Sequence, residues 1–146
     1  MIDIFDIMGP IMVGPSSSHT AGAVRIGRMA RTLLGERPAR AIFCLHGSFA
    51  ETGVGHGTDK ALVAGLLGMA TDDFNIPNSF AVAAERGLTF TFHEVDLRDA
   101  HPNSVVVDVE GVTGKRLVMQ ACSTGGGRIQ VNKIDGVEVN FTGDYH

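Results

Sequence analysis

Five consecutive polar residues follow a Gly-Pro pair near the start of the chain: Ser16, Ser17, Ser18, His19 and Thr20. A helical pattern begins directly after them. A helix start needs one Ser, Thr, Asp or Asn side chain to accept a hydrogen bond from an unpaired backbone N–H group. Capping therefore explains one of these residues, or two at most. Because a helix N-terminus also carries a partial positive charge, the remaining hydroxyls suit a bound carboxylate or phosphate.

A second polar turn, Gly55-His56-Gly57-Thr58-Asp59, precedes another helical pattern. The glycines on either side of His56 indicate an imidazole displayed on a tight turn. An imidazole titrates near neutral pH, which suits it to general acid or base catalysis. The alternative interpretation is an ordinary turn with an exposed histidine, in which Thr58 or Asp59 caps the helix that follows.

Two further turns carry groups that can contact a ligand. His101 and Asn103 flank a proline ahead of a valine-rich segment, and Gly125, Gly126 and Gly127 follow a Ser-Thr pair. Glycines let a backbone approach an anion closely. Taken alone, each turn is first of all a connection between two elements. Together, the four turns predict loops gathered around one site.

The spacing of apolar residues predicts the helices and strands that must position these turns, and this spacing changes along the chain. Apolar residues recur with a helical period over residues 20–34, with arginines on the polar side, and again over 57–69. A buried strand is expected at 39–49, a turn at 71–80, and one or two helical turns at 81–87. Alternation then predicts strands at 88–97, 104–111, 115–124 and 127–141, with hairpin turns at 112–114 and 135–136. The order predicts an α+β domain spanning 1–146, with one mixed or antiparallel sheet covered by helices on one side.

Composition excludes several classes of protein. The chain has 146 residues, with 12 Lys and Arg against 16 Asp and Glu, and no basic stripe that would favour nucleic acid. No apolar run approaches the ~20 residues of a membrane helix, and the acidic start does not resemble a signal peptide. Cys44 and Cys122 lie far apart in apolar surroundings, which favours buried, reduced thiols and a cytoplasmic protein. Because no paired-cysteine or His-Glu-x-x-His spacing occurs, metal ligation by this chain is poorly supported.

The motifs GPSSSHTAGAVRIG, GVGHGTDKAL, HPN and STGGG, in this order, cover almost the whole chain. This chain resembles the β subunit of the two-subunit, iron–sulfur-dependent L-serine dehydratases (L-serine ammonia-lyases) of bacteria. The resemblance implies an α+β domain of the kind that also serves some phosphoglycerate dehydrogenases as an allosteric substrate-binding domain. It further implies deamination of L-serine to pyruvate and ammonia, in amino-acid catabolism and gluconeogenesis, by a complex with a separate α subunit.

The resemblance also implies a division of labour. A four-iron, four-sulfur cluster needs three or four thiolates, and this chain has two cysteines. The α subunit is therefore expected to hold the cluster, and this chain is expected to be inactive alone. His56 is the expected acid or base near the Cα proton or the departing hydroxyl. The expected substrate-binding residues are Ser16, Ser17, Ser18, His19, Thr20, His101, Asn103, Gly125 and Gly126, with Gly127 beside them.

Two other functions stay open at this level. One is a non-catalytic regulatory module that binds serine or another small anion, and the other is a structural dimerisation domain. An exposed apolar face is expected where the α subunit docks, and copies of the chain can form a homodimer through it. Related β subunits commonly carry an ACT-like domain after this region, whereas this chain ends at residues 141–146. Both a naturally short form and a fragment are consistent with that.

Overall fold

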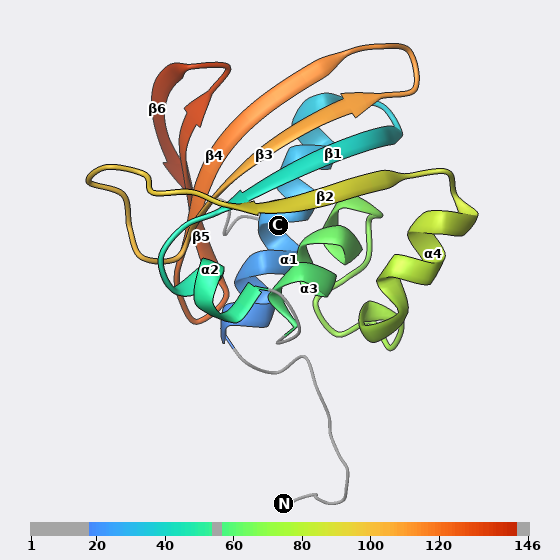
Figure 1. Cartoon of the computed structure of the whole chain (residues 1–146), viewed down its shortest axis with the longest axis horizontal. Helices are drawn as coiled ribbons and strands as arrows, with labels where there is room; N and C mark the ends of the chain where they lie inside the picture. The colour runs from blue at the N-terminus through green and yellow to red at the C-terminus, as the bar shows by residue number, and fades with distance from the viewer. Residues whose placement is uncertain (1–17, 54–56, 143–146) are drawn as a thin grey trace, which may run out of the picture.

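The computed structural model describes residues 18–53 and 57–142 of the chain (Figure 1). Five helical segments and six strands follow one another there. They are α1 (Ser18–Leu34), β1 (Pro38–Leu45), α2 (Ser48–Gly53), α3 (Thr58–Leu66), the 3-10 turn η1 (Ile76–Asn78), α4 (Ser79–Glu85), β2 (Thr89–Glu94), β3 (Ser104–Gly111), β4 (Arg116–Gly125), β5 (Arg128–Ile134) and β6 (Val137–Thr142).

The six strands form one mixed sheet in the order β2-β1-β3-β4-β5-β6. All neighbours pair antiparallel except β1 and β2, which run parallel from Arg40 opposite Thr89 to Leu45 opposite Glu94. The α+β fold with a mixed sheet is confirmed. β2 is the one described strand after residue 88 that has no antiparallel neighbour. A parallel pair needs a long crossover, and α2, α3 and α4 supply it.

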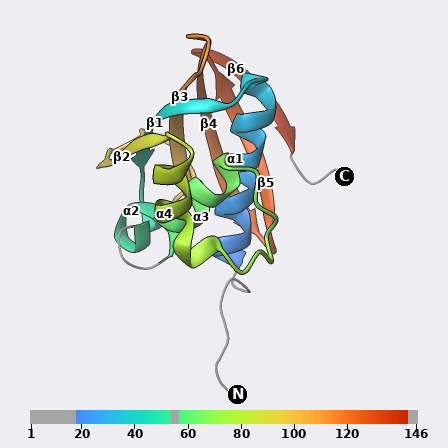
Figure 2. The same ribbon diagram turned by 90° about the vertical axis from the view of Figure 1, so that its right-hand side faces the viewer.

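The two faces of the sheet differ in polarity. On β3, Val105, Val107 and Val109 are fully buried. The intervening Asp108 and the following Glu110 point to the other face and are only half-buried. Side chains alternate between the two faces of a strand, so one face lies in the core and the other is open. Figure 2 shows the helices gathered as a layer on one side of the sheet.

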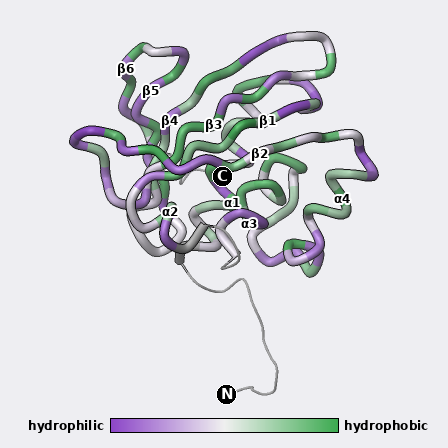
Figure 3. The backbone as a smooth tube through the Cα atoms, viewed as in Figure 1, coloured by the Kyte–Doolittle hydropathy of each residue, from purple (hydrophilic) through white to green (hydrophobic). Residues whose placement is uncertain are grey.

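Helices α1 and α3 touch backbone to backbone beneath the sheet. A Cβ atom on Gly65 would lie 2.0 Å from the carbonyl oxygen of Val24, and one on Gly27 would lie 2.4 Å from the carbonyl oxygen of Leu62. Glycine is required at both positions because no larger residue fits. This contact fixes α3 against α1. Figure 3 shows hydrophobic stretches in both the sheet and the helix layer, and a hydrophilic turn between β2 and β3.

The arginines on the polar side of α1 bind the end of α3. The Arg28 guanidinium donates to the carbonyls of Gly68 (3.0 Å) and Met69 (2.9 Å), and that of Arg31 donates to the Leu66 carbonyl (3.0 Å). The last carbonyls of a helix have no partner inside the helix. Arg31 therefore pairs with the last carbonyl of α3, and Arg28 holds the turn that follows the helix.

Several predicted boundaries move in the structure. The strand expected at 39–49 ends at Leu45, because Gly47 turns the chain (φ 62°) and α2 begins at Ser48. The last predicted strand, 127–141, is two strands joined by Asp135 and Gly136, the predicted hairpin turn. The turn expected at 71–80 already contains η1 and the start of α4. Within the described residues, no helix combines the length and the apolar character that crossing a membrane requires.

Candidate functional site

The candidate site lies at one end of the sheet, where β1 and β4 end and β3 and β5 begin. Leu45 is paired with Val105 at this end, and Ser104 is paired with Cys122. We call it the site end of the sheet. Two of the connections at this end, the turn before β3 and the turn after β4, belong to segments that the sequence singled out.

The start of α1 is held at the site end by a contact between Gly22 and Ser123. A Cβ atom on Gly22 would lie 2.2 Å from the Ser123 Oγ, and Ser123 is 1% exposed. The first turns of α1 therefore rest directly on the end of β4. This brings the helix N-terminus, with its partial positive charge, to the same place as the strand ends.

The three glycines after β4 lie beside this helix start. Gly125, Gly126 and Gly127 all have positive φ angles, of 103°, 64° and 79°. A Cβ atom on Gly127 would lie 3.5 Å from the Cβ of Ala21, whereas one on Gly125 or Gly126 would meet nothing within 4 Å. The backbone of Gly125 and Gly126 is thus open to close approach, as the predicted anion-binding role requires.

The turn at 101–103 is tied into the same end by two backbone hydrogen bonds. The Asn103 carbonyl accepts from the Ser123 N–H at 3.0 Å, and the Pro102 carbonyl accepts from the Ser48 N–H at 2.7 Å. The first bond joins the turn to β4, and the second joins it to the start of α2. The structure therefore brings His101 and Asn103 together with Gly125 and the start of α1.

His101 is held in one tautomer by its own turn. Its Nδ1 accepts the Asn103 N–H at 3.0 Å, and its carbonyl accepts the Ser104 hydroxyl at 2.7 Å. A nitrogen that accepts from an N–H carries no proton, so neutral His101 has its hydrogen on Nε2. The exposed ring can therefore donate a hydrogen bond from Nε2.

The structure adds His46, which the sequence analysis passed over as the end of a buried strand. Its side chain is 15% exposed and lies 4.0 Å from Asp96, measured between Nδ1 and Oδ1. The same Nδ1 accepts the Leu97 N–H at 3.0 Å. His46 thereby anchors the segment that leads from β2 to His101. The sequence feature that could have indicated His46 is its place directly before Gly47, as a polar residue within an apolar segment.

The start of α3 buries two polar side chains. Thr58 is 2% exposed and Asp59 is 5% exposed. The N-cap residue of α3 is Gly57, with φ 99° and no side chain, so the N-cap position expected of Thr58 or Asp59 is wrong. Asp59 instead accepts the Lys60 N–H at 2.7 Å. The two residues are buried at the start of α3.

Several predicted residues cannot be compared with the structure. Ser16, Ser17 and His56 lie outside the described residues. Ser18 and His19 form the first positions of α1, and only their place in the helix is described. Thr20 follows in the first turn and is half-buried.

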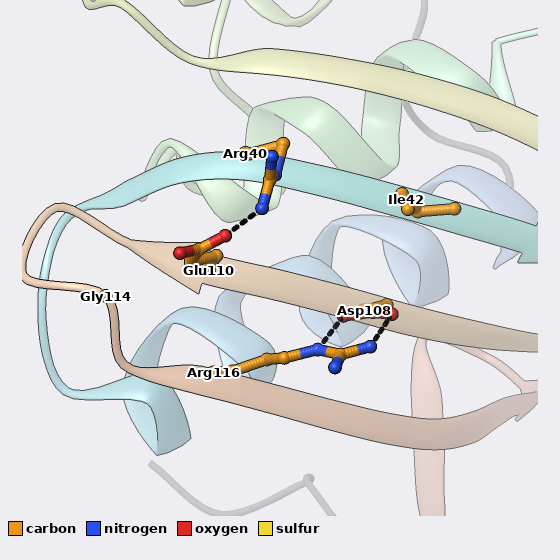
Figure 4. A pocket seen from close by; sticks show the side chains of 6 residues that line it. All are labelled: Arg40, Ile42, Asp108, Glu110, Gly114 and Arg116. Atoms are coloured by element: carbon orange, nitrogen blue, oxygen red, sulfur yellow. Dashed lines mark hydrogen bonds and ion pairs between the residues drawn. The ribbon is translucent and has the colours of Figure 1, made fainter.

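A hollow of about 410 Å³ lies on the open face at the opposite end of the sheet (Figure 4). Two ion pairs line it. Arg116 donates two hydrogen bonds to Asp108, from Nε to Oδ1 at 2.9 Å and from Nη2 to Oδ2 at 2.7 Å. Arg40 forms the second ion pair, with Glu110. Its charges already neutralise one another, and it contains no residue that the sequence singled out. It is a surface feature of the sheet rather than part of the site.

The two cysteines lie on different strands with β3 between them. Cys44 on β1 is half-buried, and Cys122 on β4 is buried. Burial raises the pKa of both thiols, and the charge of Asp108 raises the pKa of Cys44 further. Both residues therefore favour the protonated thiol, which is a poor metal ligand. Among the described residues, no three His, Cys, Asp or Glu side chains come together as a metal site would require.

Comparison with known proteins gives a consistent family. The model of the serine dehydratase beta chain family matches residues 1–85. The chain is 44% identical over 142 residues to the probable L-serine dehydratase beta chain of Bacillus subtilis (strain 168) and 45% identical over 142 residues to the L-serine dehydratase beta chain of Peptoniphilus asaccharolyticus. It is also 42% identical over 82 residues to L-serine dehydratase 2 of Escherichia coli (strain K12), of which it covers 18%.

The first two matches include 97% of this chain and 64% of each relative. The chain thus spans somewhat less than two thirds of the length of these beta chains. On this evidence the chain belongs to the serine dehydratase beta chain family.

Proposed function

We propose that this chain works with a separate α subunit as an L-serine ammonia-lyase, converting L-serine to pyruvate and ammonia in the cytoplasm. The observation that carries the proposal is the meeting of three predicted segments at the site end. The Ser123 N–H joins the 101–103 turn to β4 at 3.0 Å, and the same residue packs on Gly22 of α1. A pocket for a small polar substrate needs such converging polar groups.

The substrate carboxylate is assigned to the start of α1. The unpaired N–H groups and partial positive charge of a helix N-terminus favour an anion. The hydroxyls of Ser16, Ser17, Ser18 and Thr20, with His19, supply further donors. Gly125 and Gly126 bring backbone to the opposite side without a side chain in the way.

The reaction removes the Cα proton and breaks the bond between Cβ and the hydroxyl oxygen. The pair of electrons from the C–H bond forms the Cα–Cβ double bond, and the hydroxyl leaves as water after taking up a proton. The aminoacrylate product tautomerises to an imine, which water hydrolyses to pyruvate and ammonia. His56 is proposed as the group that moves one of these protons, and the Nε2–H of His101 as a donor to the bound substrate.

The iron–sulfur cluster is assigned to the α subunit, because two protonated thiols on separate strands do not fit a cluster that needs three or four thiolates. Bound there, such a cluster supplies a Lewis-acidic iron for the substrate hydroxyl or carboxylate. This chain contributes the opposite wall of the pocket and the proton-transfer groups.

Anaerobic reconstitution tests the proposal directly. The isolated chain should produce no pyruvate from L-serine, and addition of the α subunit should start production. His56→Ala should lower kcat by about 10²-fold or more, the usual contribution of a general acid or base. The matched control is Thr32→Ala, an exposed residue near the far end of α1, which should leave kcat unchanged. A His56→Ala complex with wild-type kcat would remove His56 from the chemistry.

The regulatory-module alternative predicts three different results. The isolated chain would bind L-serine in calorimetry, Ser17→Ala would weaken that binding, and the complex would keep its kcat without His56. A wholly structural domain would show no change in melting temperature with millimolar serine. The reconstituted complex therefore separates all three functions.

A further inference from the structure

The outer edge of β2 is a feature that the proposed function leaves unused. Among the described strands, β2 lies at one end of the sheet and pairs only with β1. The Val95 N–H donates to the Leu45 carbonyl at 2.9 Å, so odd-numbered residues direct their backbone groups toward β1. Because this direction alternates along a strand, Phe90, Phe92 and Glu94 direct their N–H and C=O groups outward.

Aromatic rings line this edge on the helix side. Phe80 of α4 lies 4.7 Å from Phe90 between ring centroids, and Phe90 lies 5.8 Å from Phe92. Phe92 also stacks on buried Phe43 at 5.0 Å. Phe80, Phe90 and Phe92 are only half-buried, so part of each ring reaches the surface. β2 contains no proline or lysine that would protect the edge from pairing with another strand.

We propose that β2 pairs antiparallel with β2 of a second copy of this chain, around a twofold axis at Thr91, so that two sheets become one. In this register Phe90 lies opposite Phe92 of the second copy, and both residues direct their backbone groups to each other. Aromatic residues opposite one another are favourable cross-strand pairs. Thr91 faces its own counterpart, and Thr89 faces His93.

Charge at the end of β2 supports the antiparallel direction. Exposed Glu94 and Asp96 stand there, whereas Glu85 and Arg86 before the strand offset each other and the Arg86 guanidinium donates to the Leu67 carbonyl at 3.2 Å. Antiparallel pairing keeps the acidic ends of the two copies apart. A parallel arrangement would place like charges together. Centring the pair at Phe92 instead would set Glu94 opposite Phe90, which is less favourable than two aromatic pairs.

Cysteine cross-linking of the full chain tests both the pairing and its register. Residues that face each other in a non-hydrogen-bonded antiparallel pair have Cα atoms about 4.5 Å apart, within the range that a disulfide spans. Thr91→Cys should give a covalent dimer under mild oxidation. The matched control is Thr89→Cys, which is exposed on the same face of the same strand but lies opposite His93. Equal cross-linking of the two variants, or none, overturns the proposal.

Charge swapping provides a second test that does not need oxidation. The wild-type chain should have a solution mass of twice 15.4 kDa by light scattering. Thr91→Lys and Thr91→Glu place like charges at the axis, so each alone should lose the dimer, and an equimolar mixture should recover it. Thr32→Lys, which adds the same charge on α1, should remain dimeric. Circular dichroism establishes that each variant is folded.

Two results contradict the proposal. One is a wild-type chain with the mass of a single copy at every concentration measured. The other is an unchanged mass for Thr91→Lys together with loss of α-subunit binding, which would show that the edge accepts a strand of that subunit. Pyruvate production by the reconstituted complex is a separate measurement, so failure of this inference leaves the proposed function intact.

Discussion

Gly22 and Ser123 approach each other so closely that α1 can meet β4 only while residue 22 has no side chain. A Cβ atom on Gly22 would lie 2.2 Å from the Ser123 Oγ and 2.8 Å from its Cβ. Both residues are buried. Their contact sets the height of the α1 start above the site end of the sheet, and with it the position of Thr20 in the first turn of the helix.

Gly22→Ala should therefore destabilise the chain by about 1–3 kcal/mol, the usual cost of overpacking a core. The clash is with a side chain, so Ser123→Gly should relieve most of it in the double variant. Urea unfolding of the wild type, both single variants and the double variant measures the coupling. Additive losses would show that the two residues do not restrict each other.

Gly65→Ala should cost more than Gly22→Ala, at about 3 kcal/mol or above, the upper part of the overpacking range. The atom in the way is the Val24 carbonyl oxygen, 2.0 Å from the added Cβ, and a main-chain atom moves only with the whole helix. Val24→Ala should accordingly bring no recovery in the Gly65→Ala background. Thermal unfolding checks both results, and a mild loss for Gly65→Ala would mean that α1 and α3 are further apart.

Gly126→Ala separates backbone strain from ligand contact. Its φ of 64° is left-handed, so alanine should cost about 1–2 kcal/mol, but no atom lies within 4 Å of the added methyl group. If substrate uses that space, the KM for L-serine in the reconstituted complex should rise several-fold. Gly136→Ala is the matched control, since Gly136 has φ 84° and equally open surroundings in the β5–β6 turn at the other end of the sheet. Equal KM values for the two variants would exclude Gly126 from the pocket.

Glu36 should give the fold a small acid sensitivity. The hydroxyl and N–H of Thr113 donate to its carboxylate, which holds the pKa of Glu36 below its ordinary value of 4.5. A lowered pKa means that the stabilisation is complete above the unfolded value and is lost as the pH falls through the folded one. Glu36→Gln should thus narrow the difference between urea midpoints at about pH 6 and about pH 3. A difference as large as in the wild type would show that other carboxylates account for the acid sensitivity.

The sequence predicted the regular elements well where one period was clear. Residues 104–111 are rich in valine, with Asp108 and Glu110 on either side of Val109, and β3 has those bounds. The strand predicted at 39–49 is too long at its C-terminal end. Phe49 continues the apolar run of the strand in the sequence, but it lies in α2, which begins at Ser48 after the turn at Gly47. Apolar character alone does not separate a buried strand from a buried helix. The parallel pairing of β2 with β1 could not be predicted from the sequence, because it depends on where the chain rejoins the sheet after three helices.

The turns of the candidate site could be predicted from the sequence, but the contacts that hold these turns in place could not. Glycine, histidine and hydroxyl clusters indicated four turns, and the described parts of those at α1, 101–103 and 125–127 do meet. His46 was missed because it is one polar residue in an apolar segment, and its partner Leu97 is 51 positions away. The packing of Gly22 on Ser123 was equally hidden, since a glycine within a helical pattern does not reveal what it faces.

The parallel pairing of β1 and β2 has a consequence for the order of folding. Short turns join the four strands from β3 to β6. Pairing of β1 with β2 instead brings Arg40 opposite Thr89, and three helices lie between these residues in the chain. Contacts between residues distant in the chain form at a higher entropic cost, so β2 should join the sheet last and leave it first. Native-state hydrogen exchange should then find the β2 amides opening below the free energy of global unfolding. Detachment of this single strand would remove the aromatic edge while the contact between α1 and β4 stays intact.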